Sequence, residues 1–126
     1  MRIYVTFAEN SAPWELSMEL FVESLARYRA DARSAVRTQG TGEYASFDLE
    51  LGGKPCHGGY FPDQQLIMDG GSVEAWAPVI EWFLGLLPFD ARADTFLEPA
   101  TVSRNLPRTA TAADIARILA ASPRPH

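Results

Sequence analysis

The sequence has very little cysteine, lysine and histidine, and this scarcity excludes several kinds of site. Because Cys56 is its one cysteine, the chain cannot form an internal disulfide, which fits a reducing compartment. Cys56, His57 and His126 are too few for a zinc site, which needs about three or four such ligands. No apolar run approaches the roughly 20 residues of a membrane-spanning helix. We therefore expect a soluble cytoplasmic protein without a metal, a cofactor or a membrane segment.

Length and composition favour an independently folded domain. The chain has 126 residues, of which 47% are hydrophobic, and domains usually contain about 100–150 residues. We expect a single domain over residues 1–122 and a flexible tail over residues 123–126.

Charge is distributed unevenly along the chain. Residues 38–98 carry ten acidic residues against only Lys54 and Arg92. A segment this acidic repels phosphate backbones, which argues against direct binding of nucleic acid. It would attract a basic protein and accelerate the encounter, although a net charge of −5 also serves solubility alone.

Alternating apolar residues and turn signals predict five strands, at residues 2–8, 33–39, 43–51, 65–69 and 94–97. Residues 40–42 predict a hairpin turn between the second and third of these strands. Residues 52–63, rich in Gly and Pro, predict the main loop, and residues 99–110 predict irregular chain.

Three helices are predicted from apolar periodicity and capping residues. The first follows Asn10 or Ser11, with Pro13 in its first turn. The second spans residues 72–87. The third follows Thr111, where Asp114 completes a capping box.

This order of elements predicts an α+β fold, with about three helices packed on one face of a mostly antiparallel sheet. A ferredoxin-like split β-α-β core is one topology compatible with the order. Such folds host many functions, so the fold alone does not identify one.

Several large side chains lie outside the buried stripes of the predicted helices. Trp82 and Leu86 fall opposite the stripe of helix 72–87, and Leu16 and Leu20 fall opposite that of the first helix. Exposed aromatic residues beside carboxylates are typical of protein-binding surfaces. The alternative is that a third helix or a second sheet layer covers these side chains.

The candidate catalytic groups are Cys56 with His57, and Asp63 with Asp69. A cysteine and a histidine can act as nucleophile and base, but neighbouring side chains on an extended segment point apart. The two aspartates flank strand 65–69 and could form a carboxylate pair or a weak cation site. Turn chemistry also explains them, since Pro-Asp and Asp-Gly are common turn pairs. We expect no catalytic site.

In its size, its acidity and the Ala-Pro-Val-Ile-Glu-Trp-Phe-Leu helix of residues 77–84, the chain resembles bacterial immunity proteins of polymorphic-toxin, contact-dependent and type VI secretion systems. The resemblance extends over the whole chain without a diagnostic motif, so no family residue is transferred. It implies an inhibitor that covers the active site of a cognate toxin domain. It also makes acidic residues 43–81 the expected contact, since many toxin domains that act on nucleic acids or nucleotides are basic.

The partner-binding residues expected on this interpretation are Trp82, Leu86, Asp48, Glu50, Glu43, Tyr60 and Phe61. Two other functions stay open. One is a small enzyme that uses the region of Cys56, His57, Asp63 and Asp69. The other is a homo-oligomeric structural or sensor module that associates through Trp82 and Leu20.

Overall fold

Seven strands and three helices form the part of the chain that the structure, a computed structural model, describes: residues 2–8, 14–62, 64–98 and 103–120. In chain order they are β1 (Arg2–Phe7), α1 (Met18–Tyr28), β2 (Arg33–Gln39), β3 (Gly42–Leu51), β4 (Lys54–Phe61), β5 (Gln65–Asp69), α2 (Val73–Leu86), β6 (Ala93–Glu98), β7 (Arg104–Leu106) and α3 (Ala112–Ala120). Within these ranges no helix is long and apolar enough to cross a bilayer.

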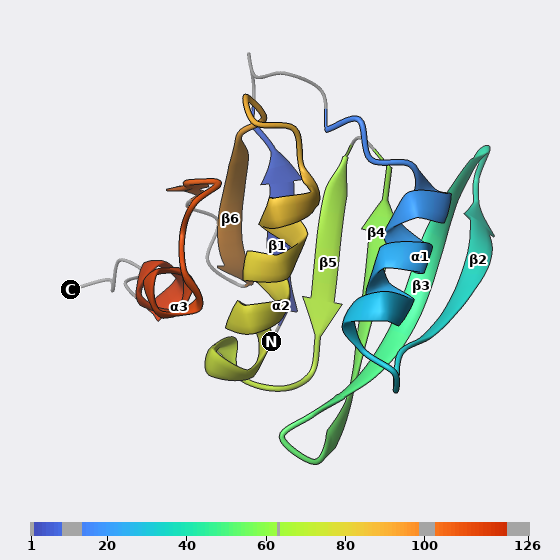
Figure 1. Cartoon of the computed structure of the whole chain (residues 1–126), viewed down its shortest axis with the longest axis horizontal. Helices are drawn as coiled ribbons and strands as arrows, with labels where there is room; N and C mark the ends of the chain where they lie inside the picture. Colours follow the sequence, from blue (N-terminus) through green and yellow to red (C-terminus); the bar gives the residue numbers. More distant parts are fainter. Residues whose placement is uncertain (1, 9–13, 63, 99–102, 121–126) are drawn as a thin grey trace.

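The strands form one antiparallel sheet in the order β2-β3-β4-β5-β1-β6-β7 (Figure 1). The predicted α+β class is confirmed. A split β-α-β unit lies at the centre, because β5, α2 and β6 enclose β1 between the two strands. Strands β1 and β4 enclose β5 in the same way, joined through α1 and the β2–β3 hairpin. The central order β6-β1-β5-β4 is therefore ferredoxin-like, as the sequence suggested.

The two longer helices cover the same face of the sheet. Figure 1 shows α1 in front of β3 and β4, and α2 in front of β1 and β5. Since side chains alternate along a strand, the inward residues of these strands form the core, among them Ile3, Val5, Phe47, Tyr60, Leu66 and Met68. No helix of the described chain covers the other side. We call this side the open face; it presents Arg2, Tyr4, Arg33, Tyr44, Ser46, Asp48, Glu50, His57, Gly59, Phe61, Ile67, Asp69, Phe96 and Glu98.

Phe21 on α1 lies at the centre of an aromatic cluster that joins both helices to the sheet. Its ring stacks on that of Tyr60, with 4.6 Å between the centroids, and lies 5.5 Å from Phe47 and 6.1 Å from Phe83 of α2. The Tyr60 hydroxyl donates a hydrogen bond to the carbonyl of Leu16 at 2.6 Å. The cluster therefore fixes α1, α2 and the segment before α1 against one face.

The predicted loop over residues 52–63 is wrong, because most of it forms β4 between β3 and β5. The positions of its glycines and its proline in the sheet explain why these residues are tolerated there. Gly58 faces the core beneath Phe47, where a Cβ atom would clash with the ring. Gly59 faces the opposite side. Pro55, opposite Glu50, stands near the start of the strand, where proline is tolerated.

The first helix begins later than predicted. Its N-cap is Ser17, whose hydroxyl accepts a hydrogen bond from the Leu20 amide at 3.1 Å. The predicted caps Asn10 and Ser11, and Pro13, lie outside the described residues.

Trp14 and Leu16 explain the error. Both are buried, although neither belongs to the helix, and Glu15 between them has a positive φ of 31°. Burial at every second residue is typical of an extended segment, whereas the predicted helix placed Leu16 opposite its buried stripe. The predicted surface patch is accordingly wrong for Leu16 and correct for Leu20, which is exposed.

The other sequence predictions agree closely with the structure. The β2–β3 hairpin and β5 are confirmed, and α2 is capped by Ser72. Thr111 and Asp114 exchange hydrogen bonds in the predicted capping box of α3. The region expected to be irregular contains the short strand β7.

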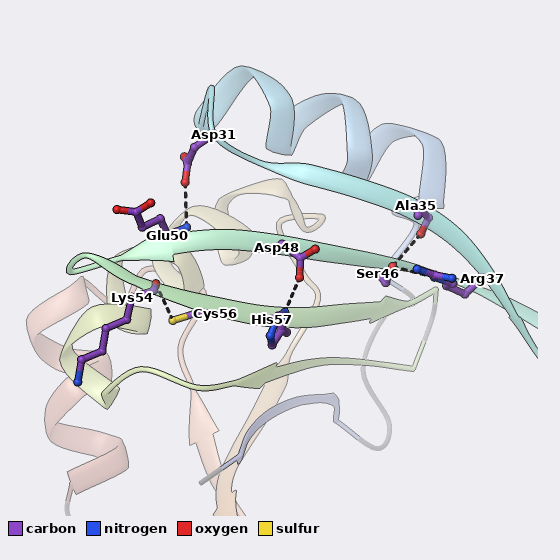
Figure 2. Close-up of polar contacts among 9 residues, drawn as sticks. All are labelled: Asp31, Ala35, Arg37, Ser46, Asp48, Glu50, Lys54, Cys56 and His57. Carbon is purple, nitrogen blue, oxygen red and sulfur yellow. Dashed lines mark hydrogen bonds and ion pairs between the residues drawn. The ribbon is translucent and has the colours of Figure 1, made fainter.

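Two residues of the α1–β2 connection bind the backbone of β3 beyond the end of β2. The Asp31 carboxylate accepts a hydrogen bond from the Glu50 backbone amide at 2.9 Å (Figure 2). The Arg29 guanidinium donates a hydrogen bond to the Glu50 carbonyl at 2.7 Å. Arg29 also binds Asp31 at 3.0 Å. These side chains replace the backbone partners that β2 no longer supplies.

Truncation of the central ring tests the core. We expect Phe21→Ala to cost about 3–5 kcal/mol of unfolding free energy, because it leaves a cavity at a fully buried site. Leu20→Ala, on the exposed side of the same helix, should change it by less than about 0.5 kcal/mol. Urea unfolding measures both values. Similar values for the two variants would contradict the described packing of α1.

The Asp31 contacts predict a pH dependence of stability. The hydrogen bond from the Glu50 amide, followed by that from Arg29, holds the pKa of Asp31 below its ordinary value of 3.8. The ionised carboxylate therefore stabilises the fold above that pH, and the contribution is lost as pH falls.

We expect Asp31→Asn to unfold at lower urea than the unchanged protein at pH 7, and the difference to shrink as pH falls through about 4. The control is Glu43→Gln, which removes an exposed carboxylate for which no bond to another described residue is found. A difference that widens in acid would contradict the assignment.

Candidate protein-binding surface

The open face is organised in rows, because residues paired across antiparallel strands share a face. One row, which we call the charged row, contains Arg33, Asp48, His57, Asp69, Arg2 and Glu98. The adjacent middle row contains Ser46, Gly59, Ile67, Tyr4 and Phe96. The sheet thus assembles residues from both ends of the chain into two continuous lines.

Two aromatic pairs lie on this face. Tyr4 and Phe96 stack with 4.5 Å between their centroids and 9° between their planes. Tyr44 and Phe61 stack at 4.6 Å and 14°. All four rings are partly buried. A sheet side that faced only solvent would carry mainly polar residues, so these pairs mark the face as more than a solvated surface.

A hollow of about 220 Å³ lies over Gly59. It exists because Gly59 contributes no side chain where its neighbours in the middle row do. Its lining residues are Arg2, Tyr44, His57, Gly58, Gly59, Phe61, Ile67 and Asp69. The hollow therefore joins an aromatic pair to the charged row.

The charged row contains two close contacts between side chains. Arg2 and Asp69 are 3.5 Å apart, and each side chain is about half exposed, at 47% and 48%. His57 Nδ1 binds the Asp48 carboxylate, and Figure 2 shows the imidazole turned toward it. A hydrogen bond with the Tyr4 side chain, together with the charges of Tyr4, Asp69 and Glu98, raises the pKa of Arg2. Three carboxylates and two guanidinium groups thus share this row.

Among the described candidate catalytic residues, the structure brings His57 and Asp69 together and separates both from Cys56. Cys56 faces the core with no exposed surface, and its thiol lies 3.6 Å from the Lys54 carbonyl (Figure 2). His57, the next residue, faces the opposite side. Asp69 lies beside His57 in the charged row, and Asp63 is outside the described residues. Within those residues no group of three His, Cys, Asp or Glu side chains is arranged to hold a metal ion.

Trp82 and Leu86 lie on the helix side of the molecule and are partly buried. The Trp82 ring stacks on Tyr28 at 4.9 Å and 6°, and lies 5.8 Å from Phe21. Partial burial raises the pKa of Tyr28. Helix α1 thus covers much of Trp82, whereas the alternative cover offered by the sequence was a third helix or a second sheet layer.

The other predicted contact residues are divided between different surfaces. Tyr60 is fully buried, so its placement on an exposed loop is wrong. Phe61 and Asp48 lie on the open face, as does the side chain of Glu50. Glu43, which precedes Tyr44 by one residue, lies on the helix side. The acidic residues 43–81 therefore do not form one surface.

Sequence reasoning missed most of the open face. Tyr4, Ile67 and Phe96 alternate with buried residues along their strands, and this alternation was the available signal. It also missed Phe89, whose side chain is 89% exposed beside a hollow of about 490 Å³ that includes Arg92 and Arg108. The sequence signal for its exposure was that Phe89 lies between Pro88 and Asp90, outside any predicted helix or strand.

Compared with known proteins, the chain matches no family model, and no curated protein or solved structure shows significant similarity to it. The function must therefore be inferred from the surface described above.

The burial of Cys56 predicts slow alkylation. Iodoacetamide at neutral pH should react much more slowly with the folded protein than with protein in urea, because the thiol is reached only through opening of the fold. A Cys56→Ser, Ser34→Cys variant carries an exposed thiol on β2 and should react rapidly in both conditions. Equal rates for Cys56 and that thiol in the folded state would revive the enzyme hypothesis.

Proposed function

We propose that the chain is a protein-binding inhibitor of the immunity type, which neutralises a toxin domain by covering its active site. The observation that carries the proposal is the open face, on which two stacked aromatic pairs accompany a row of charges and one of the pairs lines a hollow. Aromatic anchors within a polar rim are typical of the energetic centre of protein interfaces.

The charges on this face favour a protein over a nucleic acid as the partner. Asp48, Asp69 and Glu98 lie in the charged row, and the chain carries a net charge of −5. Carboxylates among aromatic residues repel a phosphate backbone, whereas a basic protein surface could pair with them.

The hollow over Gly59 is small for a small-molecule substrate. Pockets for such ligands usually measure about 300–1,000 Å³, and this hollow measures about 220 Å³. A larger hollow of about 610 Å³ beside Tyr44 and Phe61 has neither Cys56 nor His57 in its lining. The separation of those two side chains across the sheet supports binding through a surface rather than catalysis.

Among protein-binding proteins, the immunity role is supported by the small size and acidity of the chain and by a sheet with α1 and α2 on the same face. Each partner commonly contributes roughly 800 Å² to a stable interface, and the open face extends across β3, β4, β5, β1 and β6. An inhibitor of this kind needs no catalytic group, because covering the active site is sufficient. Its partner would be the product of a neighbouring gene that encodes a toxin domain.

Growth rescue tests the proposal. A bacterium that expresses the toxin domain encoded next to this gene should stop growing, and co-expression of this chain should restore growth. Ile67→Asp should abolish rescue, because it adds a carboxylate to the apolar centre of the open face. Leu20→Asp introduces the same group at an exposed site on the helix side and should leave rescue intact.

Three outcomes would contradict the proposal. One is a toxin that the unchanged chain fails to neutralise, and another is a neighbouring gene without a toxin domain. The third is a stable dimer in solution that Ile67→Asp converts to a monomer, since it would assign the open face to self-association.

A further inference from the structure

The two edges of the sheet differ in length and in cover. Strand β7 forms one edge with only three residues, and α3 packs against it. Strand β2 forms the other edge with seven residues, and no described strand or helix lies beyond it (Figure 1). It contains no proline, lysine or bulge, the features that commonly protect an edge strand from further pairing. The β2 edge is therefore open to another strand.

Two contacts of β3 show which backbone groups of β2 face this strand. The Glu50 amide donates to Asp31 in the α1–β2 connection, so the backbone of Glu50 faces the side on which β2 lies. Backbone groups alternate in direction along a strand of an antiparallel ladder, so Ser46, four residues earlier, faces the same side. Ser46 is paired with Ala35, whose carbonyl also accepts its hydroxyl at 3.2 Å (Figure 2). Ala35 therefore directs its backbone groups at β3.

Alternate residues of β2 have the opposite orientation. Ser34, Val36 and Thr38 direct their N–H and C=O groups away from β3, into the space beyond the edge. Their side chains lie on the helix side of the sheet, because their partners on β3 include the buried residues Phe47 and Ala45. Val36, in the middle, is 55% exposed. An apolar side chain thus marks the centre of a row of outward-facing backbone groups.

We propose that β2 pairs with β2 of a second copy of this chain, antiparallel and around a two-fold axis at Val36. In this register Val36 lies opposite the same residue of the second copy, and Ser34 lies opposite Thr38. Each pair consists of outward-facing residues, which exchange both backbone hydrogen bonds. Cross-strand pairs of β-branched side chains and of hydroxyl groups add to the stability. The proposal goes beyond the proposed function and does not depend on it.

The charges of β2 select this register. Arg33 lies opposite Gln39 of the second copy, and Arg37 lies opposite Ala35. An axis at Ala35 would place Arg33 opposite Arg37, and an axis at Arg37 would place that residue opposite itself; like charges directly opposite are destabilising. Arg37 Nε also lies 3.4 Å from the Ser46 hydroxyl on β3, which turns the guanidinium away from the edge (Figure 2). The strand is therefore complementary to its own copy in charge as well as in hydrogen bonding.

The dimer leaves the open face of each copy uncovered. A two-fold axis between antiparallel strands stands perpendicular to the sheet, so the helices of both copies lie on one side and both open faces lie on the other. Each copy contributes a single strand of seven residues. Because the contact is small, we expect a weak dimer in rapid exchange with the monomer.

Hydrogen exchange tests the pairing in the unchanged protein. At micromolar concentration the amides of Ser34, Val36 and Thr38 should exchange rapidly, and at millimolar concentration their exchange should slow by about tenfold or more. The amides of Ala35 and Arg37, which face β3, should be protected at both concentrations. Equal exchange of the outward-facing amides at both concentrations would overturn the proposal.

Sedimentation equilibrium of two variants provides the second test. Val36→Pro removes the central donor without removing a bond to β3, and an edge strand tolerates proline. It should raise the dissociation constant of the dimer about tenfold or more, because two symmetry-related hydrogen bonds are lost. Val36→Thr keeps the N–H group and the β-branched shape, so it should dimerise like the unchanged protein. If Val36→Pro fails to fold, hydrogen exchange of the unchanged protein still decides the question.

The outcomes separate this dimer from the proposed inhibitor function. A chain that stays monomeric at millimolar concentration would overturn the dimer and leave the function to the growth-rescue experiment. A dimer that Ile67→Asp dissociates and Val36→Pro does not would assign self-association to the open face and overturn both proposals. Protection of the outward-facing amides only after the toxin domain is added would assign the edge to a toxin strand and overturn the second copy as its occupant.

Discussion

The stack of Phe21 on Tyr60 is the contact on which the architecture depends. It places α1 against β4, and through Phe83 it brings α2 to the same face of the sheet. Because both helices pack on that side, no helix in the described part of the chain covers the outward residues of the central strands. The surface proposed for binding is therefore a consequence of where the aromatic core lies.

Strand β4 shows how closely core and surface are linked. Its two adjacent glycines serve opposite faces: Gly58 leaves room for the Phe47 ring in the core, and Gly59 leaves the hollow on the open face. The same alternation separates Cys56 from His57, and Tyr60 from Phe61. A shift of one residue in register would exchange the two sets and destroy both core and surface.

Local patterns were sufficient to predict much of the fold. The hairpin at Gly40, strand β5, the Ser72 cap of α2 and the Thr111–Asp114 capping box all depend on residues close together in sequence. Strand β4 was not predictable in this way, because its Gly and Pro residues are explained by Phe47 and by the strand end, which only the folded sheet brings near. Likewise, the burial of Trp14 and Leu16 depends on contacts with distant residues, among them the bond between Tyr60 and the Leu16 carbonyl.

The candidate site was less predictable than the fold, because it depends on register between strands far apart in sequence. Asp69 meets Arg2 and His57 only once β5 pairs with both β1 and β4. The count of acidic residues between positions 38 and 98 predicted an acidic surface, yet the sheet divides them between two faces and places Arg2 and Arg33 among them. On such a face, overall charge assists the approach of a basic partner. The order of charges along the row, together with the hollow beside it, is what would distinguish one partner from another.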